Sequence, residues 1–169
     1  GQLAKDLLEG KSDNVLVFYG DHPFLRAETI KDLAEHHKES EAALTMMTID
    51  VPQDNPELQT YFKDFGRIVR GESGRVERIV EVKDATPEEL AIKEVNPSFF
   101  AFKADWLWKR INDLVSDNAQ HEYYLTDLVE MAVRDGEKLE SYKIQDPVEG
   151  VGINNPDQFD LARRLHAAR

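Results

Sequence analysis

Residues 15–21, Val-Leu-Val-Phe-Tyr-Gly-Asp, are the stretch that decides the fold class. The first four form a short, continuous apolar run, which is typical of a strand covered on both faces, as in a parallel sheet. Tyr19-Gly20-Asp21 ends this strand, and His22-Pro23 blocks its continuation. In open α/β sheets, ligands bind outside the carboxyl ends of the strands. Asp21 therefore lies where a binding site is expected.

Outward from this strand, strand-like and helix-like segments alternate, which favours an α/β fold. Helices are expected over Ala27–Lys38, from Thr86, from a cap at Asp105, over Leu125–Arg134 and from a cap at Asn155. Strands are expected over Ala42–Val51, twice within Phe65–Val82, over Glu94–Phe102 and over Lys138–Ile144, with a loop over Pro52–Pro56. The sequence thus predicts a mostly parallel sheet flanked by helices, in a single domain of residues 1–169.

The composition narrows the classes of function. The 169 residues carry a formal net charge of −12, which argues against a nucleic-acid or anionic-membrane surface, since both need clustered Lys and Arg. There are no cysteines, so disulfides and thiolate metal sites are excluded. No apolar run is long enough to span a bilayer, and no leader opens the chain, so the cytoplasm is the expected location. An anionic ligand would need a cation to offset the acidic charge.

Two polar residues are candidate Mg²⁺ ligands. Asp21 ends the most apolar strand, and a carboxylate there can bind Mg²⁺, which prefers oxygen donors. If Asn155 caps the terminal helix, Asn154 is free to turn outward and offer its carboxamide oxygen. The alternatives are that Asp21 only begins a turn and that both asparagines belong to the turn before the helix.

Three further positions suit a sugar ligand. Gly66, Glu81 and Asn96 each lie at the edge of a strand-like stretch. Side chains such as Glu and Asn can match the paired hydroxyls of a sugar. The alternative for Glu81, with Lys83, is a solvated strand face.

Together, the motifs resemble those of sugar-1-phosphate nucleotidyltransferases. In order, they are Tyr-Gly-Asp, Gly-Arg-Ile, Val-Glu-Val-Lys-Asp-Ala-Thr, Glu-Val-Asn, Glu-Tyr-Tyr-Leu-Thr-Asp and Gly-Ile-Asn-Asn, between about Asn14 and Leu165. The resemblance is greatest to the uridyltransferase domain of bacterial N-acetylglucosamine-1-phosphate uridyltransferases. It implies a Rossmann-like nucleotidyltransferase fold and Mg²⁺ as cofactor. The implied substrates are N-acetylglucosamine 1-phosphate and a nucleoside triphosphate, of which UTP is the nearest choice.

The resemblance also implies roles for individual residues. Asp21 and Asn154 would bind Mg²⁺, and Tyr19 and Gly20 would line the site beside the phosphates. The sugar would be held by the backbone of Gly66 and by the side chains of Glu81, Asn96, Tyr124 and Thr126. For Tyr124 and Thr126 the alternative is core packing and helix capping.

The sequence departs from the family pattern in three places. Asn96 is followed by Pro97-Ser98, where the family usually has Thr-Gly, and the approach Val148–Gly152 is longer than usual. Both changes leave the identity of the sugar open, with glucose 1-phosphate as an alternative. The segment with which the family reads the base is absent, so the nucleotide is open too, with dTTP as an alternative. The family's Gly-x-Gly-Thr-Arg-Met loop, which cradles the triphosphate, is absent from the sequence, as are hexapeptide repeats of an acetyltransferase. The nucleotide-binding N-terminal part is therefore expected to be missing, and these 169 residues to be inactive alone.

Two other functions remain open at this point. The chain could be a non-catalytic relative that senses a sugar nucleotide, or an unrelated α/β module. The residues contain no His-centred catalytic group: His36 and His37 are adjacent on a predicted helix and do not share a face. Nucleotidyl transfer needs no general base, since a phosphate oxygen is already ionised at neutral pH.

Overall fold

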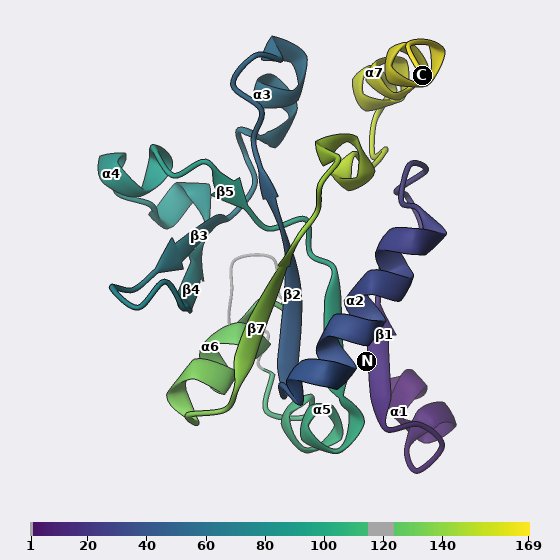
Figure 1. The fold of residues 1–169 in the computed structure, drawn as a ribbon, viewed down its shortest axis with the longest axis vertical. Coiled ribbons are helices and arrows are strands. Elements are labelled where there is room, and N and C mark those ends of the chain that lie inside the picture. Colours follow the sequence, from purple (N-terminus) through teal and green to yellow (C-terminus); the bar gives the residue numbers. More distant parts are fainter. Residues whose placement is uncertain (1, 115–123) are drawn as a thin grey trace.

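A computed structural model describes residues 2–114 and 124–169 of the chain and shows a sheet with helices on both faces (Figure 1). The sheet has the strand order β1-β6-β2-β5-β3-β4, and β7 pairs with the other edge of part of β2. The strands are β1 (Asn14–Val17), β2 (Leu44–Asp50), β3 (Arg67–Arg70), β4 (Val76–Val80), β5 (Glu94–Val95), β6 (Phe100–Lys103) and β7 (Leu139–Lys143).

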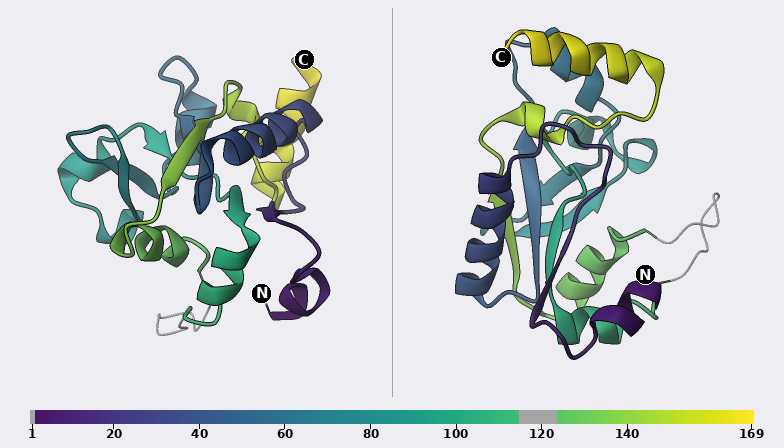
Figure 2. Two further views of the ribbon diagram at one scale, coloured as in Figure 1. Left: turned by 60° about the horizontal axis from the view of Figure 1, so that its bottom comes forward. Right: turned by 90° about the vertical axis from the view of Figure 1, so that its right-hand side faces the viewer.

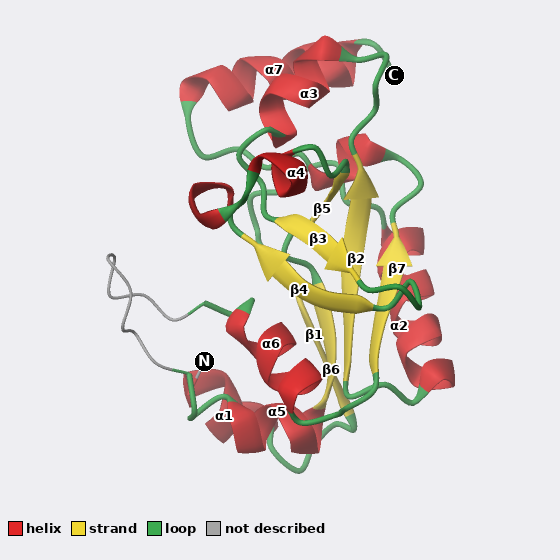
Figure 3. Ribbon diagram, turned by 90° about the vertical axis from the view of Figure 1, so that its left-hand side faces the viewer, coloured by secondary structure: helices red, strands yellow, loops and turns green. Residues whose placement is uncertain are grey.

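The helices are α1 (Gln2–Leu8), α2 (Ala27–Ser40), α3 (Pro56–Phe62), α4 (Pro87–Leu90), α5 (Ala104–Arg110), α6 (Asp127–Arg134) and α7 (Pro156–Ala167). Two short 3-10 helices, η1 (Val82–Asp84) and η2 (Pro147–Gly150), complete the described elements. The views in Figure 2 place α2 on one face of the sheet and α5 and α6 on the opposite face. Figure 3 shows α3 and α7 beyond the carboxyl end of β2. Among the described residues, none of these helices is long and apolar enough to cross a membrane.

The α/β class is confirmed, but the predicted strand directions are corrected. Strand β2 runs parallel to β7, whereas β6 pairs antiparallel with both β1 and β2, and the pairings of β3 with β4 and β5 are antiparallel. Strands β1, β2 and β7 thus share one direction, and β6 runs against them. A continuous apolar run reports burial on two faces, not direction, so the sequence could not reveal this reversal.

Two apolar cores explain why β2 carries apolar side chains on both of its faces. Leu44 and Met46 of β2 face the core under α5 and α6, and Met47 and Ile49 face the core under α2, α3 and α7. All four side chains are fully buried. The alternation of a strand sends successive side chains to opposite faces, and helices cover both faces.

Several local predictions are confirmed by hydrogen bonds. Thr86 and Glu89 form a reciprocal capping box at α4, and the Asn155 side chain accepts from the Gln158 N–H at 2.9 Å to cap α7. After α6, Gly136 has a φ of +70° and donates its N–H to Val133 O at 3.1 Å, as expected of the residue after a helix end.

Two local predictions were wrong, and one helix was not predicted. Asp105 does not cap α5; it lies in the first turn of that helix, and Lys103 precedes it without a side-chain cap. The strand expected over Glu94–Phe102 is two strands, because Pro97 and a left-handed Ser98 interrupt the pairing. The loop expected over Pro52–Pro56 is confirmed as far as Asn55, whose side chain caps α3, a helix that was not predicted.

Candidate functional site

Loops at the carboxyl ends of β1, β4 and β5 meet the loop that precedes α7 and enclose a cavity of about 350 Å³. The predicted site residues that line it are Tyr19, Asp21, Gly66, Glu81, Asn96 and Asn154. The other lining residues are His22, Tyr61, Asp64, Phe65, Pro97, Ser98 and Gln158. The structure thus brings the two predicted metal ligands and three of the predicted sugar-binding residues to one cavity.

The loop of Asp21 and the loop of Asn154 are joined directly. The Ile153 N–H donates to Asp21 O at 3.0 Å. A Cβ built on Gly152 would lie 2.9 Å from Asp21 Oδ2 and 3.1 Å from His22 Nε2, which is closer than real Cβ atoms approach oxygen. A larger residue at position 152 would therefore require the Asp21 carboxylate or the backbone of one loop to shift.

Two residues that the sequence did not single out hold this junction. The Tyr61 hydroxyl, from α3, donates to Gly152 O at 3.1 Å and accepts from the Gly152 N–H at 2.8 Å. The ring nitrogen Nδ1 of His22 lies 3.0 Å from Asp21 Oδ1, and the ring packs edge-on against Phe99 with centroids 4.7 Å apart. The sequence indicated for His22 only that, with Pro23, it ends the first strand, and Tyr61 was missed because no helix was predicted around it.

Burial and the Asp21 carboxylate shift the pKa values of His22, Tyr19 and Tyr61. Burial lowers the pKa of His22 below its ordinary value, while the nearby Asp21 carboxylate acts in the opposite direction. Burial also raises the pKa values of Tyr19 and Tyr61, and Asp21 adds to both shifts. The two hydroxyls therefore stay protonated and act as hydrogen-bonding groups at neutral pH.

An ion pair between the half-exposed Arg26 and the buried Glu149 supports the same junction. Glu149 in η2 is fully buried, and its carboxylate accepts from Arg26 Nη2 at 2.7 Å, from Arg26 Nε at 3.1 Å and from the Arg26 backbone N–H at 3.1 Å. Arg26 immediately precedes α2, so the negative charge lies at the start of that helix. The pair fixes the chain after Asp21 to the chain before Gly152.

The donor set at the junction fits Mg²⁺. Within the described part of the chain, Asn154 is bonded through its backbone N–H, which donates to Gln158 Oε1 at 2.7 Å, and its side chain makes no hydrogen bond. A carboxylate and a carboxamide oxygen are hard donors, and Mg²⁺ takes few protein ligands and completes its shell with phosphate and water. No group of three or more His, Cys, Asp or Glu side chains that could hold a metal is found among residues 2–114 and 124–169.

On the other side of the cavity, Asn96 and Gly66 are in contact. The Asn96 side chain is buried at 5% exposure, and its backbone N–H donates to Gly66 O at 3.0 Å. A Cβ on Gly66 would lie 2.8 Å from Ile79 Cγ2 and 3.4 Å from Glu81 Oε1. Burial raises the pKa of Glu81, and the charge of Lys83 opposes that shift. Glu81 is nevertheless an exposed residue directly after β4, which agrees with the alternative of a solvated face.

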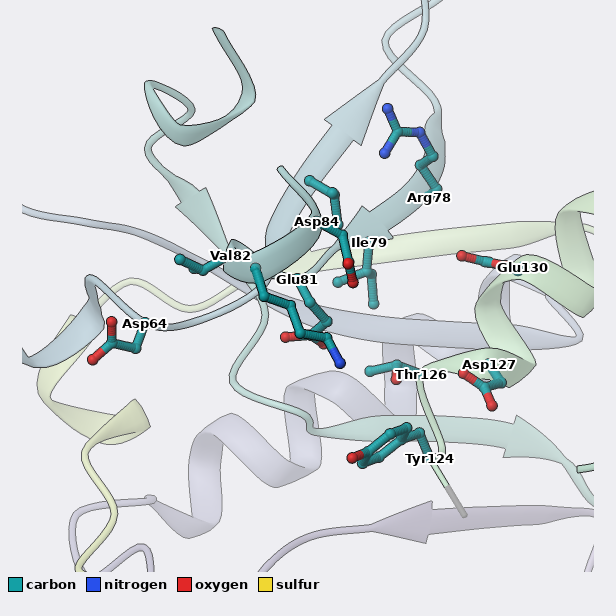
Figure 4. A pocket seen from close by; sticks show the side chains of 12 residues that line it. Asp64, Arg78, Ile79, Glu81, Val82, Asp84, Tyr124, Thr126, Asp127 and Glu130 are labelled. Carbon is teal, nitrogen blue, oxygen red and sulfur yellow. The ribbon is translucent and has the colours of Figure 1, made fainter. Parts of the chain in front are cut away.

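Tyr124 and Thr126 border a second cavity of about 780 Å³, which shares Asp64 and Glu81 with the first. In Figure 4, Glu81 extends into the space that Tyr124 and Thr126 border. The Thr126 side chain makes no cap bond to α6, which does not support the capping alternative. Gly20 lines neither of these two cavities, and a Cβ there would meet no atom within 4 Å.

Comparisons with known proteins extend these observations. The family model described as "Nucleotidyl transferase" matches residues 2–147. The protein named "Bifunctional protein GlmU" from Trichlorobacter lovleyi is 45% identical over 164 residues, which are 97% of this chain and 33% of that protein. The protein of the same name from Pelobacter propionicus is 40% identical over 162 residues, 96% of this chain and 34% of that protein. The chain therefore spans about a third of the length of these curated relatives.

A solved structure supports the fold. CMP:2-keto-3-deoxy-manno-octonic acid synthetase, complexed with CTP, matches with a TM-score of 0.62 over 99% of this chain and 67% of that one, at 12% identity. At that identity the match concerns the fold alone. The resemblance stated from the six sequence motifs is confirmed by the family match over most of the chain, and the chain belongs to the nucleotidyl transferase family.

Proposed function

We propose that, in the full-length protein, this chain supplies the metal and sugar side of a site that transfers a nucleotidyl group from UTP to N-acetylglucosamine 1-phosphate. The products are pyrophosphate and a nucleotide sugar of the kind used as a cell wall precursor in the cytoplasm. The observation that supports this most directly is the cavity of about 350 Å³ that Asp21, Asn154, Glu81 and Asn96 line together. A sugar and its phosphate can then be bound by one continuous surface.

Asp21 and Asn154 would hold Mg²⁺ in this proposal. When bound, the ion neutralises phosphate charge, which a chain of net charge −12 otherwise opposes. The Ile153 N–H and the His22 ring keep the Asp21 loop and carboxylate in place, and Tyr61 fixes the backbone of Gly152. These contacts are made by the protein alone, so the Asp21 carboxylate and the backbone before Asn154 are ordered before the substrates bind.

The sugar would be held by the side chains of Glu81 and Asn96 and by the backbone of Gly66. Tyr124 and Thr126 would close the sugar side from the adjoining cavity. Tyr19 and Gly20 would lie beside the phosphates. A phosphate oxygen of the sugar 1-phosphate then attacks the α-phosphorus in line; the new P–O bond forms as the bond to pyrophosphate breaks. No residue is required to remove a proton, so catalysis consists of positioning the substrates and neutralising their charge.

The sequence contains no Gly-x-Gly-Thr-Arg-Met loop to cradle the triphosphate. We therefore expect the 169-residue chain to show little or no turnover by itself. The proposed activity requires such a loop in the same protein.

The test is a panel of sugar 1-phosphates and nucleoside triphosphates, assayed for pyrophosphate release by the full-length protein with Mg²⁺. N-acetylglucosamine 1-phosphate with UTP should give the highest kcat/KM. A higher value for glucose 1-phosphate or dTTP would reassign the substrates. Binding of the sugar nucleotide without pyrophosphate release from any pair would overturn the enzymatic proposal in favour of a sensing protein.

The metal assignment has its own test in the same assay. Asp21→Ala should reduce turnover by at least about 100-fold, because charge stabilisation by a metal contributes several kcal/mol to the transition state. Asp54→Ala, which removes an exposed carboxylate after β2, is the matched control and should leave turnover unchanged. Wild-type turnover of Asp21→Ala would exclude Asp21 as a metal ligand.

A further inference from the structure

Ser98 has a backbone conformation that a side chain normally avoids. Its φ is +63°, in the left-handed region that favours glycine. Among the described residues, Glu41 is the other non-glycine residue with a positive φ, at +55°, and it ends α2 away from the cavity. Strained residues persist where the surroundings over-determine them, often next to a functional group.

The strain at Ser98 accompanies two contacts with one side chain. The Ser98 N–H donates to Asn96 Oδ1 at 2.9 Å, and Asn96 Nδ2 donates to Ser98 Oγ at 3.4 Å. Both ends of the Asn96 carboxamide are therefore engaged by one residue, which fixes its rotation. One Nδ2 hydrogen and one lone pair of Oδ1 remain for a ligand.

The backbone on either side of this turn is held firmly. The Asn96 N–H donates to Gly66 O at 3.0 Å, and the Met47 N–H donates to Phe99 O at 2.9 Å. Phe99 is fully buried in the core under α2, α3 and α7. The turn between these anchors thus presents Asn96 and Ser98 to the cavity of about 350 Å³ that both residues line.

We propose that Ser98 is a positioning residue for the sugar 1-phosphate: its left-handed backbone and its hydroxyl orient the Asn96 carboxamide toward the sugar. This inference rests on the proposed function, in which Asn96 holds the sugar. Glycine at this position would relieve the backbone strain and also release one end of the carboxamide.

The experiment compares Ser98→Gly with Glu41→Gly. Both substitutions relieve the strain of a left-handed backbone, and of the two residues only Ser98 contacts Asn96. Thermal unfolding and steady-state kinetics of the full-length protein are measured, the latter with N-acetylglucosamine 1-phosphate, UTP and Mg²⁺. Neither variant should lower the melting temperature. Ser98→Gly should raise the KM for the sugar phosphate roughly fivefold, the effect of one hydrogen bond, with little change in the KM for UTP. Glu41→Gly should leave both KM values unchanged.

A double-mutant cycle shows whether Ser98 acts through Asn96. In an Asn96→Ala background, Ser98→Gly should have no further effect on the KM for the sugar phosphate. Additive effects, or an unchanged KM in Ser98→Gly, would overturn the positioning role while the wild-type activity still supports the proposed function. Absence of pyrophosphate release by the wild-type protein with every substrate pair would instead overturn the proposed function, and the role of Ser98 with it.

Discussion

Gly152→Ala should disturb the metal side of the site without removing any candidate ligand. The added methyl would lie 2.9 Å from Asp21 Oδ2, and one of the two groups must retreat by about half an ångström to reach an ordinary contact of 3.4 Å. The carboxylate cannot rotate freely, because Oδ1 is bonded to the His22 ring, which itself packs on Phe99. The strain therefore falls on the Ile153–Asp21 hydrogen bond that joins the two loops.

The magnitude follows from that displacement. Overpacking of this kind costs about 1–3 kcal/mol of stability. A misplacement of about 1 Å in a catalytic group can cost roughly 100-fold in rate, so half of that should reduce turnover about tenfold. The Mg²⁺ concentration for half-maximal activity should also rise about tenfold. The assays are pyrophosphate release against Mg²⁺ concentration, and Mn²⁺ binding followed by electron paramagnetic resonance.

Gly71→Ala is the matched control, since a Cβ there also meets a carboxylate, that of Glu77. Glu77 is exposed and can swing away, so this variant should keep the wild-type response to Mg²⁺. If Gly152→Ala loses stability but keeps the wild-type turnover and Mg²⁺ response, the close approach of the two loops serves the fold and not the metal.

Two predictions concern stability, measured by urea denaturation. Glu149→Gln should lower the free energy of unfolding by about 2 kcal/mol, because it weakens charge-assisted hydrogen bonds to Arg26, and an unchanged denaturation midpoint would contradict this. Burial lowers the pKa of His37 below its usual value of 6.5, so the unfolded chain binds a proton before the folded one does. The free energy of unfolding should then fall as the pH is lowered from about 7.5 to 5.5. The variant His37→Gln, which keeps a polar partner for Thr45, should make this dependence on pH weaker. An equal slope in the variant and the wild-type protein would contradict the assignment to His37.

The sequence predicted those elements in which a local signal is strong. The apolar run before Tyr19 predicted β1, and the capping residues Thr86 and Asn155 predicted the starts of α4 and α7. It did not reveal α3, because seven residues that begin with proline after a turn-rich stretch look like a loop. It also could not give the direction of β6, which depends on pairing with distant strands.

The sequence predicted the individual residues of the candidate site, but it did not predict the contacts that hold them in place. Asp21, Asn96 and Asn154 follow from motifs that each lie within a few residues. The ion pair of Arg26 and Glu149 joins positions 123 residues apart, and nothing in the sequence around either residue indicates its partner. The need for glycine at position 152 becomes visible only when the Asp21 carboxylate is placed against it.

The ties between the Asp21 loop and the Asn154 loop have a thermodynamic consequence. Both loops become ordered when the chain folds, because three sets of contacts hold them. These are the Arg26–Glu149 pair, the Tyr61–Gly152 hydrogen bonds and the Ile153–Asp21 hydrogen bond. The conformational entropy of these segments is thus lost during folding and not again when a ligand arrives. A cation and a phosphate should then associate with a nearly rigid receptor, with little rearrangement of these two loops on saturation.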